Sequence, residues 1–214
     1  MLPSLMTIAA YLAFVGLSAV LALTPGPDSL LVLRFSVRRA RSGICAAAGS
    51  AIGTLVWGVL VGVGLAALIE QSAELYRILK IVGGLYLLFL GVQAIVHSRR
   101  APVAEKAERI PRGSTIAAFA AGLLSTVTNP KVGLFFLAVV PQFLPKDASA
   151  FAVTMLLGGT VALVGFVYLV GLAAIAAKAT VWLRRPRVAK YIERVSGSIL
   201  AALGIGTVAT AFEA

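Results

Sequence analysis

The chain alternates between long apolar blocks and short polar segments that are mostly basic. A helix of about 20 apolar residues crosses the hydrocarbon core of a bilayer, which is roughly 30 Å thick. By that measure the pattern predicts an all-α, polytopic membrane protein with six transmembrane helices. They lie near residues 5–33, 43–69, 75–97, 114–141, 150–177 and 189–212. Because the connections are short, we expect a single transmembrane domain over residues 1–214.

Composition supports this class. Hydrophobic residues make up 60% of the 214 residues and charged residues only 13%, whereas a soluble domain carries about a quarter charged residues. The formal net charge of +11 comes from basic residues in short loops between apolar blocks, without interleaved aromatics. This arrangement argues against nucleic acid as a partner and favours anionic lipid headgroups. The one cysteine, Cys45, excludes an internal disulfide.

The basic residues also indicate an orientation. The segments after the first, third and fifth blocks, with their flanks, hold fifteen of the 19 Lys and Arg, and the opposite side holds three. Loops rich in Lys and Arg stay in the cytoplasm. We therefore expect both termini on the extracytoplasmic side.

Two clusters of helix-breaking residues interrupt the first and fourth blocks. They are Thr24-Pro25-Gly26-Pro27-Asp28 and Thr128-Asn129-Pro130-Lys131. Proline removes a backbone donor and clashes with the preceding turn, so each block should be broken there. Within a membrane, broken backbone is tolerated only where protein or a water-filled cavity covers it. We interpret the two breaks as the working site of a transporter.

The second break has the signature of a helix start, because Asn129 can cap and Pro130 fits the first helical position. Lys131 then lies in the first turn, where a cation is unfavourable unless an anion binds there. At the first break Gly26 can cap, Pro27 can begin a half-helix, and Asp28 either satisfies that helix start or serves function. Intramembrane acids are usually functional. The candidate substrate-binding residues are Thr24, Gly26, Pro27, Asp28, Thr128, Asn129, Pro130 and Lys131, with Asp28 also the proton-coupling candidate.

These two charges match a free amino acid. We expect Lys131 and the unpaired amides of the half-helix after Pro130 to receive a substrate carboxylate, and Asp28 to receive an ammonium group or a coupling proton. Without substrate, Asp28 and Lys131 should pair with each other, which lowers the cost of burying both.

The two halves of the chain repeat. Gly84 and Gly91 lie in a Val-x-Gly-x-x-Leu-x-x-Leu-Gly pattern that returns around Gly197 and Gly204. Together with the paired breaks, this predicts two three-helix repeats, approximately 1–97 and 114–212, joined by a cytoplasmic loop 98–113. Because three is odd, the repeats must be inverted.

The second block carries Gly49-x-x-x-Gly53 and Gly58-x-x-x-Gly62. Small residues at this spacing let helices approach closely. We favour packing within one chain, with a homodimer face as the alternative.

At these motifs the sequence resembles the LysE/RhtB family of amino-acid exporters. The resemblance rests on the two breaks, on the glycine-rich second and third blocks, and on Pro141-Gln142-Phe143. It implies an inner-membrane secondary transporter that exports amino acids or related metabolites, driven by the proton motive force and without a cofactor. The single acid at the breaks allows basic substrates such as lysine, whereas the uncharged region around Thr54 favours neutral ones.

Three alternatives compete with an amino-acid exporter: a transporter of a different small solute, a metal-ion transporter and an intramembrane enzyme. Metal sites need clustered carboxylates, His or thiolates, and aspartyl or serine chemistry needs paired catalytic groups. The predicted spans hold one acid at a break, Asp28, and a second, Glu193, near the start of the sixth span, and the only His lies at an edge. We therefore predict neither a metal site nor an enzyme.

Overall fold

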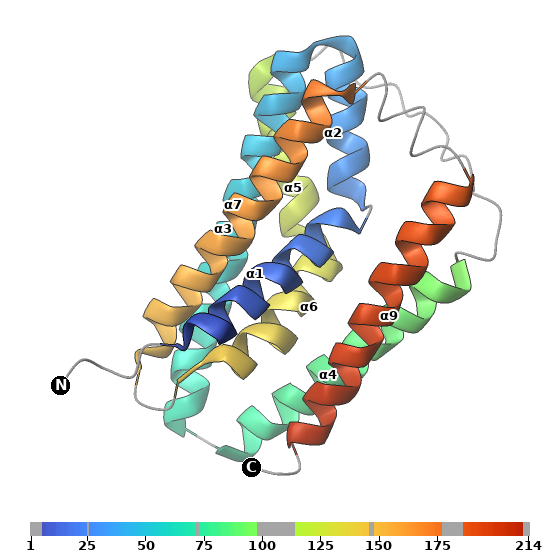
Figure 1. Ribbon diagram of the computed structural model, residues 1–214. Coiled ribbons are helices and arrows are strands. Elements are labelled where there is room, and N and C mark those ends of the chain that lie inside the picture. Colours follow the sequence, from blue (N-terminus) through green and yellow to red (C-terminus); the bar gives the residue numbers. More distant parts are fainter. Residues whose placement is uncertain are drawn as a thin grey trace.

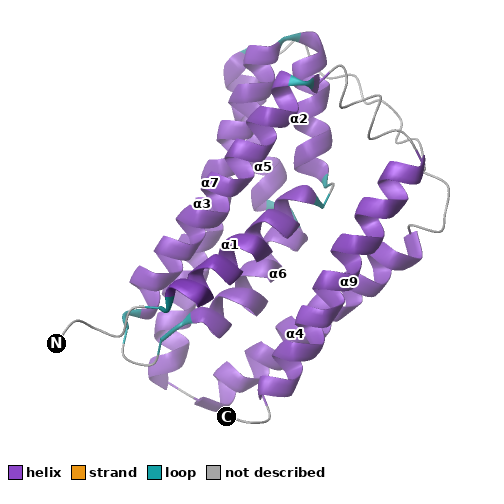
Figure 2. Ribbon diagram, in the orientation of Figure 1, coloured by secondary structure: helices purple, strands orange, loops and turns teal. Residues whose placement is uncertain are grey.

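The computed structural model describes residues 6–24, 26–71, 73–97, 114–145, 148–176 and 186–211. Pro25, the loop 98–113 and the segment 177–185 lie outside the described residues. Figure 2 shows that the described chain is helical, with short connections and no strand. The helices are α1 (Ile8–Leu23), α2 (Pro27–Arg38), α3 (Ala40–Gln71), α4 (Ala73–His97), α5 (Thr115–Val127), α6 (Pro130–Val139), the 3-10 helix η1 (Val140–Phe143), α7 (Ala150–Ala174) and α9 (Pro186–Ala211).

Within the described residues, α3 and α7 are each long and apolar enough to cross a membrane. The pair α1 and α2 and the pair α5 and α6 with η1 also qualify if each bent pair is one span. In α4 and α9 the apolar stretches are shorter, Ile81–Gln93 and Gly197–Ala209, because charged residues occupy the first turns of both helices. Four of the six predicted spans are therefore candidates on length and composition. That α4 and α9 also cross the membrane stays a prediction.

Glycines place α3 between α5 and α7. A Cβ at Gly49 would lie 2.0 Å from the Phe119 carbonyl oxygen of α5, and one at Gly58 would lie 3.6 Å from Gly158 Cα of α7. Only helices without a side chain at such positions can come this close. The preference for packing within the chain is confirmed for these glycines of the second block.

The repeated glycine pattern packs against its own copy. Figure 1 shows α4 and α9 side by side, and α4 also packs on α6, since a Cβ at Gly83 would lie 2.9 Å from Ala138 Cα. A Cβ at Gly84 would lie 3.0 Å from the Gly204 carbonyl oxygen, and one at Gly91 would lie 2.5 Å from the Gly197 carbonyl oxygen. The first glycine of each copy thus meets the second glycine of the other. Reciprocity of this kind is what a twofold relation between two repeats requires, and the inverted repeat itself stays a prediction.

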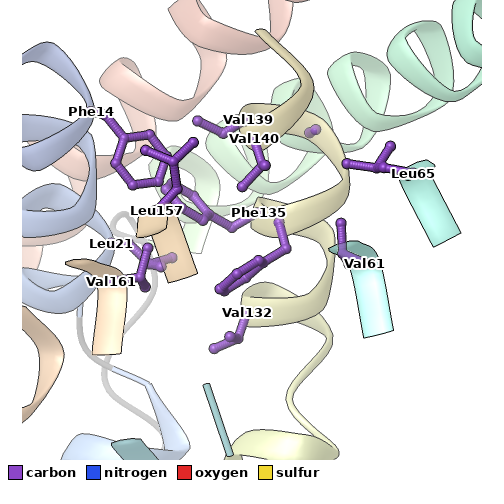
Figure 3. Packing of buried hydrophobic residues seen from close by; sticks show 12 residues of the cluster. Phe14, Leu21, Val61, Leu65, Val132, Phe135, Val139, Val140, Leu157 and Val161 are labelled. Atoms are coloured by element: carbon purple, nitrogen blue, oxygen red, sulfur yellow. The ribbon is translucent and has the colours of Figure 1, made fainter. Parts of the chain in front are cut away.

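Two separate apolar cores lie at different levels of the bundle. The first surrounds α6 and is shown in Figure 3, where Phe135 and Val132 of α6 lie among side chains from α1, α3 and α7. The second joins α2, α5, the first turns of α3 and the end of α7, and includes Val32, Ala46 and Leu172. The helix breaks lie between these cores.

Candidate functional site

Both breaks fold as helix ends followed by new helices. Gly26 adopts an extended conformation as the N-cap of α2, with Pro27 in the first turn, and the axis bends by 59° between α1 and α2. Asn129 is the N-cap of α6, again with a proline in the first turn, and the axis bends by 49°. The predicted restarts at Pro27 and Pro130 are confirmed.

Asn129 satisfies the start of α6 almost alone. Its side-chain oxygen accepts the Lys131 N–H at 3.0 Å, and its carbonyl accepts the amides of Val132 at 3.1 Å and Gly133 at 3.3 Å. Proline at the remaining position has no N–H to offer. The expectation that unpaired amides of α6 receive a substrate carboxylate is therefore wrong, because the cap residue uses these donors.

Lys131 reaches from the second break to the first. Its Nζ donates to the carbonyl oxygens of Leu21 at 2.9 Å and Thr24 at 2.8 Å, at the end of α1. Inside a continuous helix the Leu21 carbonyl would bond the amide of residue 25, but residue 25 is a proline. The cation therefore binds the electronegative end of α1, and this offsets its unfavourable place in the first turn of α6.

Asp28 reaches in the opposite direction. Its Oδ1 accepts a hydrogen bond from the Ser125 hydroxyl of α5, and its Oδ2 accepts one from Asn129 Nδ2 at 3.1 Å. The expected pairing of Asp28 with Lys131 is thus replaced by two sets of contacts that cross between the breaks. Each charged group contacts the other break, and the two breaks are braced together.

Both charged side chains line one partly enclosed cavity of about 60 Å³. One buried water molecule needs roughly 10–15 Å³ of such a cavity, so this cavity has room for several water molecules. The cavity lies between the two apolar cores: along α3, Ala46 and Ala47 belong to one core, Ser50 and Thr54 line the cavity, and Val61 belongs to the other. Its walls come from α1, α2, α3, α5, α6 and α7.

The cavity gathers five of the eight predicted binding residues, namely Thr24, Gly26, Asp28, Asn129 and Lys131. Pro27, Thr128 and Pro130 do not line it and are exposed. The two prolines begin helices, and the Thr128 hydroxyl donates to the Leu124 carbonyl.

Comparison with known proteins decides the family. The model of the family described as "LysE type translocator" matches residues 19–210. The chain belongs to the LysE-type translocator family.

The sequences of three relatives align with nearly the whole length of the translocator. It is 30% identical over 200 residues to the homoserine/homoserine lactone efflux proteins of Salmonella typhimurium and Salmonella typhi, which covers 93% of this chain and 96% of each relative. It is 27% identical over 207 residues to the uncharacterized membrane protein YrhP of Bacillus subtilis, covering 92% and 97% of the two chains. No solved structure matches the translocator.

Sequence reasoning missed the hydroxyl side chains of the translocator's cavity. Ser50 and Thr54 of α3 and Thr126 of α5 are buried and line it. One signal was present: Ser50 and Thr54 are four residues apart, which places them on one helix face. A second signal was that Pro25 deprives the Leu21 carbonyl of its helical donor, although this does not indicate which group bonds that carbonyl instead.

Proposed function

We propose that this LysE-type translocator exports amino acids or related small metabolites by binding them in the cavity between the two helix breaks. The observation that carries the proposal is that Asp28 and Lys131, with opposite charges and from different breaks, line the same cavity. A zwitterion offers the two complementary charges. The names of the Salmonella relatives, homoserine/homoserine lactone efflux proteins, support a substrate of this class.

Lys131 is the proposed carboxylate contact. An ammonium group has three protons, of which two are donated to the carbonyls of Leu21 and Thr24, so one donor remains for a substrate. A Cβ at Gly26 would lie 3.9 Å from Lys131 Nζ, and α2 begins at Gly26 without a side-chain cap. A carboxylate at Lys131 would therefore lie near the positive end of the α2 dipole.

Asp28 is the proposed contact for the substrate ammonium group, or the site of a coupling proton. Each carboxylate oxygen has two lone pairs, and each accepts one hydrogen bond, Oδ1 from Ser125 and Oδ2 from Asn129. Acceptor capacity therefore remains on a carboxylate that lines the cavity. Protonation or ammonium binding would compete with the contacts that brace the two breaks, which supplies a link between substrate and conformation.

Alternating access around this cavity is the proposed transport cycle, with the proton motive force as its energy source and the inner membrane as its location. In Figure 1 the turn between α2 and α3, the start of α5 and the end of α7 lie at the upper end of the view, and α1 begins and α9 ends at the lower end. The basic segments adjoin these upper elements in sequence, namely the turn between α2 and α3, the start of α5 and the end of α7, so we assign that end to the cytoplasm, against anionic headgroups. The termini are then extracytoplasmic. The two inverted repeats within one domain remain part of this proposal. The oligomeric state in the membrane is also open to test, with a homodimer as the alternative to a monomer.

A toxicity screen followed by one substitution tests the proposed function. Cells that overproduce the translocator are challenged with each amino acid or a toxic analogue, and resistance identifies the exported solute. Export is then measured in proteoliposomes for Lys131→Met, which keeps the side-chain length and removes the charge. We expect transport to fall at least tenfold, since interactions with a buried charge contribute about 1.5–3 kcal/mol and 1.4 kcal/mol is tenfold.

Lys190→Met is the matched control, because Lys190 lies in the first turns of α9, away from the cavity. It should export normally. Full export by Lys131→Met would remove Lys131 from the binding site. Resistance to no amino acid or related metabolite in the screen would refute the function itself.

A further inference from the structure

One hydroxyl group in the cavity wall has no hydrogen-bond partner. Thr126 lines the cavity and is only 1% exposed, and its Oγ1 is unpartnered within the part of the chain that the structure describes. Buried polar side chains are nearly always hydrogen-bonded. An unpartnered hydroxyl in the wall of a binding cavity therefore indicates a group that enters the cavity.

The surroundings of Thr126 explain why its hydroxyl does not form a hydrogen bond within its own helix. A helical threonine usually bonds the carbonyl four residues earlier. Here that carbonyl belongs to Gly122 and accepts the Ser50 hydroxyl of α3 at 3.3 Å. The Thr126 side chain is also fixed against α3, because a Cβ at Gly53 would lie 2.8 Å from Thr126 Cβ. Its own carbonyl accepts the Trp57 indole N–H at 3.1 Å.

The cavity has two walls of different chemistry. Helices α3 and α5 contribute the hydroxyl groups of Ser50, Thr54 and Thr126, whereas α7 contributes mainly apolar groups such as Val161 and Leu169, with Tyr168 as its one phenol. The hydroxyls of Ser50 and Thr54 donate to the carbonyls of Gly122 and Ser50. Of the three hydroxyls, that of Thr126 keeps both its donor and its acceptor capacity for a ligand.

We infer that Thr126 is a specificity-determining residue, whose hydroxyl hydrogen-bonds a polar group at the end of the side chain of a neutral amino acid. This inference rests on the proposed function, in which Asp28 and Lys131 hold the two charged ends of the substrate. The side chain then extends between the two walls. A third charge on the substrate would find no further counter-charge among the described lining residues, whereas a hydroxyl group would complete the bonding of Thr126. A site that hydrogen-bonds a substrate hydroxyl discriminates against the analogue that lacks it, because its own polar group is then left unpaired.

The test compares two probes of the same length, homoserine and norvaline, which differ by a terminal hydroxyl in place of a methyl group. Export of both is measured in proteoliposomes for the parent, Thr126→Val and Thr126→Ser. Valine keeps the shape of threonine and the methyl contact with Gly53, and thermal unfolding in detergent checks the fold. We expect the parent to prefer homoserine in kcat/KM and Thr126→Val to reduce that preference by about threefold to tenfold, the worth of one hydrogen bond. Thr126→Ser should restore most of the preference.

Thr154→Val is the matched control. Thr154 has the other buried hydroxyl without a partner among the described residues, it is 0% exposed, and it does not line the cavity. This substitution should leave the homoserine to norvaline ratio unchanged. If Thr126→Val keeps the parent's ratio, or lowers export of both probes equally, the inference about the side chain is overturned and the proposed function stands. If the parent exports neither probe but exports a charged amino acid, the inference is likewise overturned. If it exports no amino acid or related metabolite at all, the proposed function fails with it.

Discussion

The substitution Asp28→Asn removes one charge from the cavity, but residue 28 can still form both of its hydrogen bonds. Asn129 must present its Nδ2 to residue 28, since its oxygen is used by the Lys131 amide. An asparagine at position 28 can accept from that group with its oxygen and donate with its own amide to the Ser125 hydroxyl, which both donates and accepts. The variant should therefore fold with the same cross-links between the breaks.

The expected magnitudes follow from these contacts. Hydrogen bonds to a charged group contribute about 1.5–3 kcal/mol and neutral ones about 0.5–1.5 kcal/mol. Two weakened bonds would cost about 2–3 kcal/mol, and the loss is reduced because a half-buried carboxylate no longer has to be desolvated. We expect the free energy of unfolding to fall by about 1–2 kcal/mol. A substrate ammonium group that loses its partner charge should bind more weakly by about 2 kcal/mol, the lower end for a buried pair, or about 30-fold.

The assay is exchange of the radiolabelled substrate across proteoliposomes, with and without a pH gradient. Exchange without a gradient reports substrate binding, whereas gradient-driven export also reports coupling. Glu74→Gln is the control for charge, because Glu74 is an exposed acid at the start of α4. An unchanged KM for exchange in Asp28→Asn would refute the ammonium contact. Loss of gradient-driven export alone would then assign Asp28 to the proton.

Two further predictions concern stability, measured by thermal unfolding in detergent. Gly49→Ala should destabilise the protein by about 3 kcal/mol, because the new Cβ would lie 2.0 Å from a backbone oxygen of α5. The control Gly64→Ala, in the same helix, should be neutral or stabilising, because a Cβ there would have nothing within 4 Å. Equal losses of stability in the two variants would contradict the packing of α3 on α5. Asn129→Ala should cost about 2 kcal/mol or more, because it removes the cap of α6 and a donor to Asp28. The neighbouring Thr128→Ala removes only exposed bonds to the carbonyls of Leu124 and Ser125, so it should cost less than about 1 kcal/mol. A reversed order would show that Asn129 does not brace the breaks.

The local features of the site could be predicted from sequence because short-range rules determine them. Proline after Asn129 and after Gly26 defines two helix starts, and glycines four residues apart define close helix contacts. These rules involve residues within one or two turns of each other. Both breaks were therefore located from sequence, and the structure brings their two charged residues to one cavity; substrate binding there stays a prediction.

The partners of the charged groups could not be predicted in the same way. Lys131 and Leu21 are 110 residues apart in sequence, and several acceptors in the cavity could have satisfied the ammonium group. The competition among them depends on how α1 and α6 cross, which is a property of the packed bundle. The hydroxyl of Thr126 was missed for the same reason: it has no partner among the described residues, and its usual acceptor, the Gly122 carbonyl, bonds Ser50 of another helix.

The separation of the apolar cores has an electrical consequence. A translocator lies in a membrane that maintains a voltage, and any continuous thread of water through it would discharge that voltage. From Ala47 to Val61 the axis of α3 rises by roughly 21 Å, at 1.5 Å per residue, and apolar packing lies at both ends of this interval with the cavity between. If packing in one core is disrupted, the other core still blocks ions. Truncation of Val32 or Phe135 alone should therefore not make the membrane leaky, and ion leakage should require both substitutions together.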